Sequence, residues 1–422
     1  MQFFKWLYPG LGIKRWIILC VLGLGLIVGV ALGAVKTITH KSVFLGAFAT
    51  ALLIFGIFLV YMGIKNMVRI FIRALMPANQ GDPLVDLVYQ KRQIEFLSRG
   101  PRVAVLGGGT GLSTLLSGIK LYTNNITAIV TVTDTGGSSG RLRDEMDVLP
   151  PGDIRNCLVA LADAEPLIRD LFQYRFEEGD GLTGHSFGNL FITALSKVTG
   201  DFEKAIRASS KVLAIRGRVI PSTLEKVTLV AEFKDGTTAE GETTITEQHK
   251  PLRKIRLKPA DCSGTREALD AIENADLIIL GPGSLYTSIL PNLLIHEIRD
   301  ALLKSEAYKV FIINIMTQPG ETDNFSAYDH LRVLVEHTDP RLVDICVVNV
   351  NTVPLGMIEK YREKGAGLVR LDLDLIREKG YEVLEGSLLK VDGQVRHDPP
   401  ALARLILDHF LKLSRETAPK AA

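Results

Sequence analysis

Glycine-rich turns with polar side chains follow several apolar runs in this chain, and they are its residues best suited to holding a phosphorylated ligand. The first turn, residues 107–111, lies between a short apolar run and leucines at helical spacing. Glycines let the backbone approach a phosphate, and the start of a helix offers free N–H groups. The turn lacks the last glycine of the dinucleotide fingerprint and the Gly-Lys-Ser/Thr of a P-loop, which disfavours NAD binding and P-loop hydrolysis. A phosphate site and a purely structural tight turn remain as interpretations.

A second Gly/Ser loop begins where the next strand-like run ends, at Asp134. In open α/β sheets ligands lie at that edge, and a carboxylate there commonly meets a ribose hydroxyl or a metal. Arg141 and Arg143 at the end of the loop could clamp a phosphate with paired hydrogen bonds. Each of these residues alone could equally be a solvated loop residue. The candidate ligand contacts of this loop are Asp134, Gly136, Gly137, Ser138 and Arg141.

Two later motifs, residues 150–156 and 184–189, place polar side chains at predicted helix starts. Asp153 and Ser186 are expected to cap these helices, a structural role that such residues commonly have. No Ser or Asp relay partner for His185 is visible in the sequence, so nucleophilic hydrolysis is unsupported. The candidate ligand contacts of these motifs are Arg155, Asn156, His185 and Asn189.

Polar loops also follow two later strand-like runs, at residues 281–287 and 317–323. The first of these loops carries the hydroxyl groups of Ser284 and Thr287. Turn chemistry alone hardly explains three polar loops after strands, at residues 107–111, 281–287 and 317–323. Together they predict a ligand site at one edge of a sheet.

The elements that must position these loops alternate between strands and helices. Strand-like apolar runs lie at residues 102–106, 126–133, 276–280, 309–315 and 342–349, with helical stretches between them. This alternation predicts an α/β fold with a Rossmann-like, doubly wound and mainly parallel sheet. We expect insertions in it: β-hairpins at Asp235-Gly236 and Asp392-Gly393, and a mostly helical region over residues 153–214.

The charged residues divide the chain into two unlike pieces. Eight of the 49 Lys and Arg residues lie in residues 1–81, which contain no Asp or Glu, and all 47 acidic residues follow. The net charge of +2 is therefore the sum of a basic segment and a mildly acidic domain, and no nucleic-acid partner is expected. The four cysteines have no CxxC spacing and the eight histidines form no zinc-type cluster, so no metal site is predicted from them.

The basic segment contains two uncharged apolar runs, at about residues 16–35 and 43–64. Each is long enough to cross a bilayer; a buried core helix or, for the first run, a cleaved signal peptide is the alternative. Six flanking Lys and Arg residues against two in the connecting loop favour both termini in the cytoplasm. We therefore expect a multi-pass protein of the cytoplasmic membrane, with an anchor over residues 1–81, a linker helix over 82–99 and a cytoplasm-facing domain over 100–415.

Taken in order, the motifs resemble the gluconeogenesis-factor (YvcK) family of the CofD-like superfamily. The resemblance covers about residues 100–412 and is carried by VLGGGTGLSTLL, DTGGSSGRLRDE, PPGDIRNCLVAL, GLTGHSFGNL, GPGSLYTSILPNLL and NIMTQPGETDNFSAYDHL. It implies a Rossmann-like protein that binds a UDP-sugar such as UDP-N-acetylglucosamine and supports cell shape and cell-wall synthesis under gluconeogenic growth. Cell-wall synthesis proteins are the partners that this role implies, the membrane is the partner that the apolar spans predict, and a homo-oligomer is expected.

The alternative is an enzyme similar to the 2-phospho-L-lactate transferase that gives the superfamily its name. That relative takes a phospholactyl group from a guanosine diphosphate-activated donor with the aid of Mg²⁺. Where the family commonly has Asp-Asp-Gly-Gly, this chain has Asp134-Thr135-Gly136-Gly137. Because one carboxylate suits Mg²⁺ less well than two, a non-catalytic binding protein is the preferred interpretation. Asp134 would be a catalytic residue and a Mg²⁺ ligand only in the transferase.

The resemblance also assigns residues to the nucleotide sugar. Tyr361 and Arg396 match the aromatic and cationic positions that the family places near it, although a helix-surface Tyr and a strand-end Arg are equally good interpretations. The other matched positions are Gly108, Gly109, Thr110, Gly111, Asp134, Asn189, Gly283, Ser284 and Tyr286.

Overall fold

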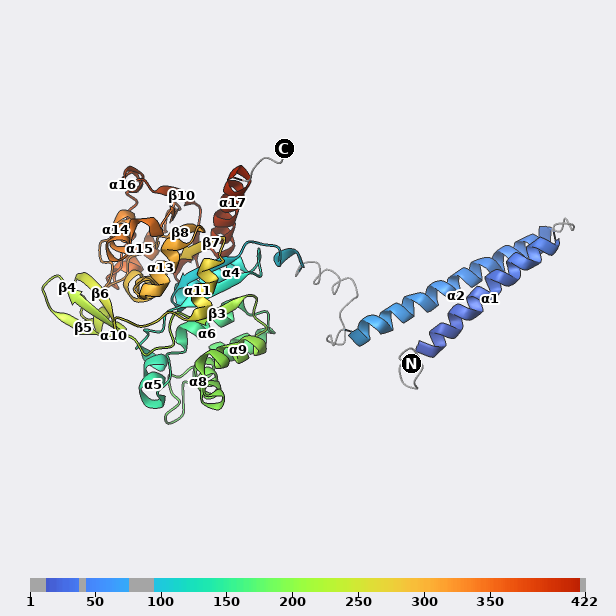
Figure 1. The fold of residues 1–422 in the computed structure, drawn as a ribbon, viewed down its shortest axis with the longest axis horizontal. Helices are drawn as coiled ribbons and strands as arrows, with labels where there is room; N and C mark the ends of the chain where they lie inside the picture. The colour runs from blue at the N-terminus through green and yellow to red at the C-terminus, as the bar shows by residue number, and fades with distance from the viewer. Residues whose placement is uncertain (1–12, 38–42, 76–94, 418–422) are drawn as a thin grey trace. The chain divides into compact units, whose positions relative to one another are not determined.

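The computed structural model describes residues 13–37, 43–75 and 95–417. The chain forms two compact units, Met1–Gln93 and Ile94–Ala422 (Figure 1). Residues 82–94 of the predicted linker helix (82–99) lie outside the described residues. The described remainder, from residue 95, has one short helical stretch at residues 95–97. The first unit contains a helical hairpin and the second an α/β fold.

Two long apolar helices, α1 (Ile13–Thr37) and α2 (Val43–Leu75), pack against each other in the first unit. Glycines permit their close approach, because a Cβ atom on Gly23 would lie 2.7 Å from the backbone oxygen of Gly56. Small residues are typical of such contacts between apolar helices. The predicted helical hairpin is therefore present in the described part of this unit.

Most apolar side chains of these two helices point away from the helix contact. Leu32 and Phe48, for example, are each 65% exposed. A core helix of a water-soluble domain would bury such side chains. Both helices are long and apolar enough to cross a membrane, over Arg15–Gly33 and Ala47–Arg69.

A seven-stranded parallel sheet forms the centre of the second unit, in the order β10-β9-β8-β7-β1-β2-β3. Its strands are β1 (Val103–Gly107), β2 (Ile126–Val130), β3 (Arg218–Pro221), β7 (Leu277–Leu280), β8 (Tyr308–Ile312), β9 (Ile345–Asn349) and β10 (Glu382–Gly386). Strands β1, β2, β7 and β9 are buried along their whole length, as expected of strands covered on both faces. The predicted α/β fold with a doubly wound, mainly parallel sheet is confirmed.

The strand order reverses between β1 and β7. The chain passes from β1 to β2 and β3 on one side, and then returns to place β7, β8, β9 and β10 on the other side. Leu106 of β1 is in register with Ile129 of β2 and Leu280 of β7, so these strands end at the same level. In such sheets ligands bind in the crevice beyond the carboxyl ends at the reversal.

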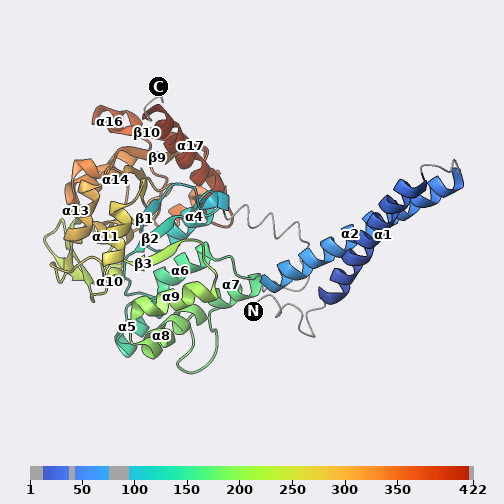
Figure 2. The same cartoon turned by 45° about the vertical axis from the view of Figure 1, so that its right-hand side comes forward.

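Helices cover the sheet in two layers. One layer contains α4, which packs against α6 and α17, and the other contains α11, which packs against α13. A further group beyond β3 contains α5, α8 and α9 (Figure 2). Residues 153–214 are mostly helical, as predicted. The helices are α4 (Gly109–Ile119), α5 (Gly137–Met146), α6 (Gly152–Leu161), α7 (Pro166–Gln173), α8 (Phe187–Thr199), α9 (Phe202–Val212), α11 (Arg266–Glu273), the π-helical turn η2 (Leu285–Ile289), α12 (Leu290–Leu293), α13 (His296–Lys304), α14 (Ala327–His337), the 3₁₀ turn η3 (Pro340–Leu342), α15 (Leu355–Arg362), α16 (Leu373–Glu378) and α17 (Pro399–Thr417).

Two small antiparallel sheets are inserted, and both predicted hairpins are found. The first contains β4 (Thr228–Phe233), β5 (Thr238–Glu240) and β6 (Leu252–Lys258), with the short helix α10 (Glu242–Glu247) after β5. The second is the hairpin of β11 (Leu389–Val391) and β12 (Val395–His397). Val395 belongs to a small separate core with Ile315, Met316 and Val353, which seats this hairpin beside the loop after β8.

Candidate functional site

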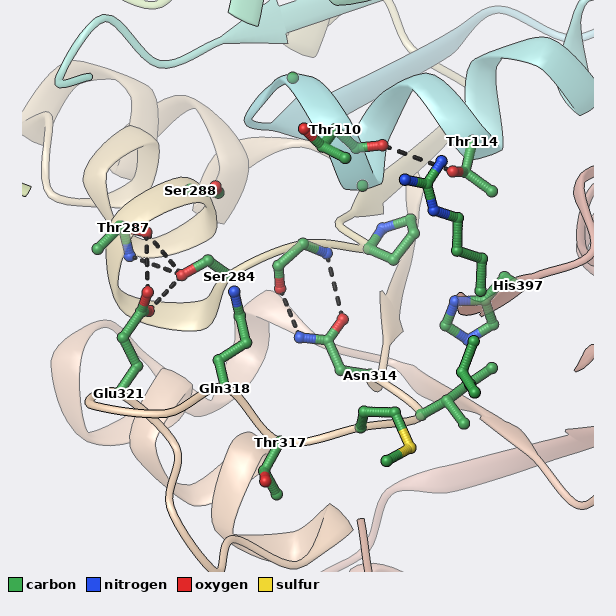
Figure 3. A pocket seen from close by; sticks show the side chains of 18 of the residues that line it. Thr110, Thr114, Ser284, Thr287, Ser288, Asn314, Thr317, Gln318, Glu321 and His397 are labelled. Atoms are coloured by element: carbon green, nitrogen blue, oxygen red, sulfur yellow. Dashed lines mark hydrogen bonds between the residues drawn. The ribbon is translucent and has the colours of Figure 1, made fainter. Parts of the chain in front are cut away.

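A pocket of about 380 Å³ lies beyond the carboxyl ends of β1, β7 and β8, at the reversal of strand order. Figure 3 shows the labelled polar side chains that surround it. The loop after β1, the loop after β7, the loop after β8 and strand β12 all contribute to its wall. Its lining includes Gly109, Thr110, Gly111, Thr114, Asp153, Glu242, Gly283, Ser284, Thr287, Ser288, Asn314, Thr317, Gln318, Glu321, Tyr361, Arg396 and His397.

The glycines of the first turn are required by contacts within the protein as well as by the pocket. A Cβ atom on Gly108 would lie 2.8 Å from an oxygen of Asp153, and one on Gly109 would lie 2.6 Å from the Cα of Asp153. A Cβ on Gly111 would lie 2.7 Å from the Cα of Gly283. The turn is thus packed tightly between the start of α6 and the loop after β7, while Gly109, Thr110 and Gly111 still line the pocket. The packing supports the interpretation as a tight structural turn, and phosphate binding by the same turn stays a prediction.

Asp153 does not cap α6 as the sequence suggested. The capping position is occupied by Pro151, and Asp153 lies in the first helical turn without a side-chain cap bond. Its carboxylate instead accepts a hydrogen bond from the backbone N–H of Gly109. Because α6 begins directly beside the glycine turn, this bond to another segment replaces the local one.

Buried hydroxyl and carboxyl groups fix the loop after β7. Ser284 Oγ caps η2 by accepting from the Thr287 backbone N–H at 3.3 Å. Ser284 and Thr287 also donate to the carboxylate of Glu321, which is 6% exposed. Burial raises the pKa of Glu321, and the two hydroxyl donors oppose that rise. The loops after β7 and β8 are therefore joined under the pocket (Figure 3).

An amide pair joins the same two loops on the other side of the pocket. Asn314 Nδ2 donates to the Gly283 carbonyl at 2.7 Å, and the Gly283 N–H donates to Asn314 Oδ1 at 3.3 Å. The side chain of Gln318 also faces the pocket, and its Oε1 has no hydrogen-bond partner among the described residues. Gln318 is thus an acceptor that a ligand hydroxyl or N–H group could satisfy.

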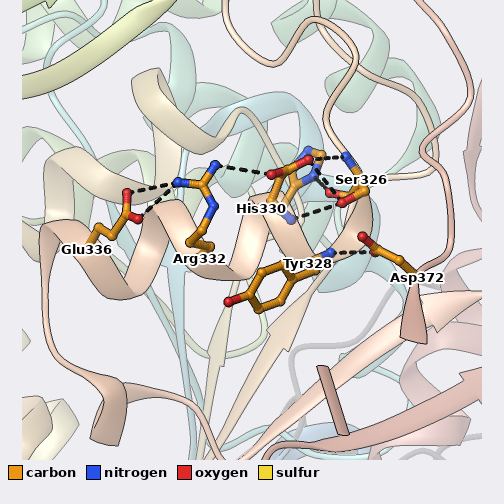
Figure 4. A network of polar contacts seen from close by, with 7 residues as sticks. Ser326, Tyr328, His330, Arg332, Glu336 and Asp372 are labelled. Atoms are coloured by element: carbon orange, nitrogen blue, oxygen red, sulfur yellow. Dashed lines mark hydrogen bonds and ion pairs between the residues drawn. The ribbon is translucent and has the colours of Figure 1, made fainter. Parts of the chain in front are cut away.

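The start of α14 anchors the loop that carries Gln318 and Glu321. Ser326 and Asp329 form a capping box, and Arg332 bridges Asp329 and Glu336 along the helix (Figure 4). The Tyr328 N–H also donates to Asp372 Oδ1 at 2.9 Å. These bonds leave little freedom to the loop between β8 and α14.

The two histidines of α14 have structural roles. His330 Nδ1 donates to the Ser326 carbonyl at 2.7 Å, and His337 Nδ1 donates to the Val333 carbonyl at 2.8 Å. Burial lowers the pKa of both imidazoles, which favours their neutral forms.

Carboxyl groups give the inner part of the pocket an acidic character. Asp153, Glu242 and Glu321 line it, and Asp134 lies close enough to influence the first two. Burial, followed by repulsion from neighbouring carboxylates, raises the pKa of Asp153 to about 7 and that of Glu242 to about 9. Both groups therefore exchange protons in the neutral to alkaline range.

Arg396 is the only Lys or Arg among the described residues that line the pocket. Its guanidinium donates to the neutral Gln394 Oε1, from Nε at 3.1 Å and from Nη2 at 2.6 Å. Tyr361 Oη accepts from the Val395 N–H at 3.0 Å and so holds the strand that carries Arg396. Next to it, burial lowers the pKa of His397 to about 4, so this imidazole is neutral at pH 7. Since no carboxylate binds Arg396 within the described chain, its charge is available to an anion.

Several predicted ligand contacts form a buried network elsewhere. Ser138 Oγ lies 3.0 Å from His185 Nδ1 and accepts from Asn189 Nδ2 at 3.0 Å. All three side chains are at most 5% exposed. No local pattern pointed to this serine partner for His185, because the two residues come together only when α5 packs on α8. None of the three lines the pocket.

Other predicted contacts are held by bonds within the protein. Arg141 donates to the Thr183 carbonyl at 2.8 Å, and Arg155 donates to Asn156 Oδ1 at 2.7 Å and to Ser186. Ser186 caps α8, as predicted. Asn156 lines a neighbouring cavity, the groove, whose walls also include Ser117, Lys120, Arg169, Lys390 and Arg396. The predicted residues outside the pocket lining are Gly108, Asp134, Gly136, Gly137, Ser138, Arg141, Arg155, Asn156, His185, Asn189 and Tyr286.

Tyr286 and Asp134 show why position in a motif does not ensure a place in the pocket. Tyr286 is 1% exposed, and its ring packs against those of Phe325 and His337. Asp134 Oδ1 accepts from the Gly136 N–H at 2.8 Å, which closes its own loop.

Mg²⁺ is not well accommodated by these carboxyl groups. Within the described ranges no group of three or more His, Cys, Asp or Glu residues is placed to share a metal ion. Asp134, which would be a metal ligand only in the transferase, accepts one hydrogen bond from the Gly136 N–H. We therefore assign no step to a metal ion.

Some lining residues were not singled out from the sequence. Asn314 interrupts the strand-like run at residues 309–315, and Gln318 and Glu321 belong to the polar loop 317–323, which was singled out without naming either residue. Glu242 comes from the inserted three-stranded module, and no local pattern distinguishes it from other surface glutamates.

Comparison with known proteins adds a family to this geometry. The family model described as "2-phospho-L-lactate transferase CofD" matches residues 103–389. The gluconeogenesis factor of Bacillus subtilis is 47% identical over 313 residues, which cover 74% of this chain and 99% of that protein. A gluconeogenesis-factor relative from Clostridium acetobutylicum is 43% identical over 422 residues, with 97% of this chain and 92% of that protein covered.

A solved structure agrees with the fold of the second unit. The crystal structure of a UPF0052 family member from Bacillus halodurans matches with a TM-score of 0.72 and 45% identity, over 73% of this chain and 99% of that one. The Bacillus proteins are thus matched almost completely by about three quarters of this chain, whereas the Clostridium relative is matched along nearly all of it. The N-terminal unit is therefore shared with some relatives and missing from others.

Proposed function

The chain belongs to the gluconeogenesis-factor family of CofD-like proteins, and from this membership and its pocket we propose that it binds a UDP-sugar of the UDP-N-acetylglucosamine type. The observation that carries the proposal is the uncompensated charge of Arg396 at the mouth of a polar pocket beside the start of α4. A cation and helix N–H groups together suit a diphosphate. The pocket volume of about 380 Å³ is within the range of small-molecule sites.

The charge distribution orients the ligand. The diphosphate lies next to Arg396 and the hydroxyls of Thr110 and Thr114, away from the carboxyl groups of the inner pocket. The uncharged sugar and base then face the amides of Asn314 and Gln318, which can donate and accept hydrogen bonds. This orientation moves the phosphates away from Arg141, the residue that the sequence suggested, because that guanidinium is bonded to Thr183.

The cellular role that we propose follows the family and the first unit. The protein supports cell shape and cell-wall synthesis during gluconeogenic growth, as a UDP-sugar-responsive regulator. The two candidate spans anchor it in the cytoplasmic membrane, and the excess of Lys and Arg at their outer flanks favours a cytoplasmic position for the α/β unit. Cell-wall synthesis proteins and further copies of the chain are its proposed partners.

A second candidate is a transferase that uses a guanosine diphosphate-activated donor, and the matching family model favours it. Against it stand Thr135 at the position of the second carboxylate and the lack of a three-ligand metal group among the described residues. If the protein is such a transferase, it consumes that donor in the presence of Mg²⁺, and Asp134→Asn abolishes turnover.

Calorimetry on the full-length protein in detergent micelles tests the proposal. We expect saturable binding of UDP-N-acetylglucosamine and recovery of the ligand unchanged after the titration. Absence of binding at millimolar ligand would overturn the UDP-sugar assignment. Turnover of the guanosine donor would replace the regulator with the enzyme.

A further inference from the structure

The groove beside the pocket is a separate cavity of about 820 Å³. It lies between the outer face of α4, the helices α6 and α7, and the β11-β12 hairpin. Thr114, Arg396 and His397 line both cavities, so the groove and the pocket meet at strand β12. A ligand in either cavity would therefore lie beside Arg396.

Positive charge predominates in the groove. Among its described lining residues are four cations, Lys120, Arg169, Lys390 and Arg396, against two carboxylates, Asp170 and Asp392. The cations come from helix α4, helix α7 and strands β11 and β12. Groups so far apart in sequence converge only through the fold, and a cleft in which positive charge is in excess attracts anions.

Two of these cations have no side-chain partner among the residues that the structure describes. The side chains of Arg169 and Lys390 are exposed and form no hydrogen bond or ion pair with another described residue. By contrast, Arg207 on α9 is paired with both Glu203 and Glu267. What distinguishes Arg169 and Lys390 from other exposed cations is that they line one cavity together with Lys120 and Arg396.

The inner wall of the groove is more firmly fixed. Lys120 Nζ donates to the Ala162 carbonyl at 2.8 Å, which holds the ammonium at the C-terminal end of α6. Asn156 Oδ1 accepts from Arg155 Nη2 at 2.7 Å, and this bond orients the Asn156 amide so that its Nδ2 remains as a donor. A fixed ammonium and an oriented amide donor are groups that phosphate oxygens accept from.

We propose that the groove is a second anion site, which takes a phosphate or diphosphate group of a small metabolite. Arg169 and Lys390 bind the anion from the outer rim, and Lys120 and Asn156 bind it from the inner wall. Arg396 lies between this anion and the ligand of the pocket, so occupation of one cavity affects the other. The site does not depend on the identity of the pocket ligand.

Pyrophosphate titrated calorimetrically into the full-length protein tests this site. The double variant Arg169→Ala/Lys390→Ala should weaken pyrophosphate binding by about tenfold or more, because two charged hydrogen-bond donors are removed. The matched control Lys211→Ala/Lys379→Ala removes two exposed lysines that line neither cavity and should bind as the wild type does. Equal binding by the wild type and the first variant, or no binding at millimolar pyrophosphate, overturns the proposal.

Repeating the titration with saturating UDP-N-acetylglucosamine identifies the source of the phosphate. If pyrophosphate still binds, the groove takes a separate phosphorylated molecule. If the two ligands exclude each other and the double variant weakens both, the groove takes phosphates of the pocket ligand itself. If UDP-N-acetylglucosamine does not bind at all, the UDP-sugar proposal fails while the pyrophosphate result still decides the groove.

Discussion

The pocket and the groove meet at Arg396 but differ in charge. Asp153, Glu242 and Glu321 line the pocket, and Arg396 is its single Lys or Arg among the described residues, whereas the groove adds three further cations to Arg396. Glycine turns and helix starts line the pocket, whereas side chains of three helices and the β11-β12 hairpin line the groove. The side chains therefore differ more than the shared strand β12 suggests, and the proposed second anion site is the cavity with the excess of cations.

Loss of Arg396 is the change expected to have the largest effect, because it serves both cavities. Arg396→Ala should weaken UDP-N-acetylglucosamine and pyrophosphate binding by about 10- to 100-fold each, since a hydrogen bond to a charged group is worth roughly 1.5–3 kcal/mol. Calorimetry measures both constants. Arg404→Ala, an exposed arginine of α17 that lines neither cavity, is the matched control. An effect on one ligand alone would separate the two cavities and contradict their coupling.

A pH titration should change the affinity of the pocket for UDP-N-acetylglucosamine. The raised pKa values of Asp153 and Glu242, about 7 and about 9, mean that these carboxyls are neutral below those values and charged above them. UDP-N-acetylglucosamine affinity should therefore fall between pH 6 and pH 9, by roughly threefold to tenfold for partly screened repulsion.

Asp153→Asn sharpens this test. Asparagine keeps an oxygen that can accept from the Gly109 N–H but cannot ionise, so the fall in affinity through pH 7 should become shallower. Glu359→Gln, an exposed α15 residue outside both cavities, should leave the profile unchanged. A wild-type affinity that does not change from pH 6 to pH 9 would show that the carboxyl groups do not face the ligand.

Removal of the N-terminal unit should have the smallest effect on binding. The Bacillus relatives are matched almost completely by about three quarters of this chain, so a protein of this family exists without the remainder. Residues 94–422 should bind UDP-N-acetylglucosamine within about twofold of the full-length protein and should leave the membrane fraction. A large loss of affinity would instead make the hairpin part of the binding unit.

Local patterns were sufficient to predict most of the sheet. The apolar run ending in glycines at residues 102–111 became β1 and the start of α4, because both signals act over a few neighbouring residues. Strands β3 and β10 were not predicted. β3 has only four residues and ends at Pro221, and β10 alternates exposed glutamates with half-buried residues at the sheet edge.

Local sequence patterns pointed to pocket-lining residues only where the polar motif after a strand itself lines the pocket. Ser284 follows a strand directly and lines the pocket, as strand-end chemistry suggests. His185 and Asn189 begin a helix beyond β3, and their side chains bond to Ser138 instead. Glu242 reaches the pocket from an inserted sheet. Contacts of this range depend on how separate modules pack, which a sequence pattern does not encode.

The most direct test of this account is an experimental structure of the full-length protein with UDP-N-acetylglucosamine. We predict that the diphosphate oxygens lie about 3 Å from the guanidinium of Arg396, the distance of a charged hydrogen bond. The sugar and base should lie between the amides of Asn314 and Gln318. A ligand bound instead beside Arg141 and His185 would contradict the assignment of the pocket.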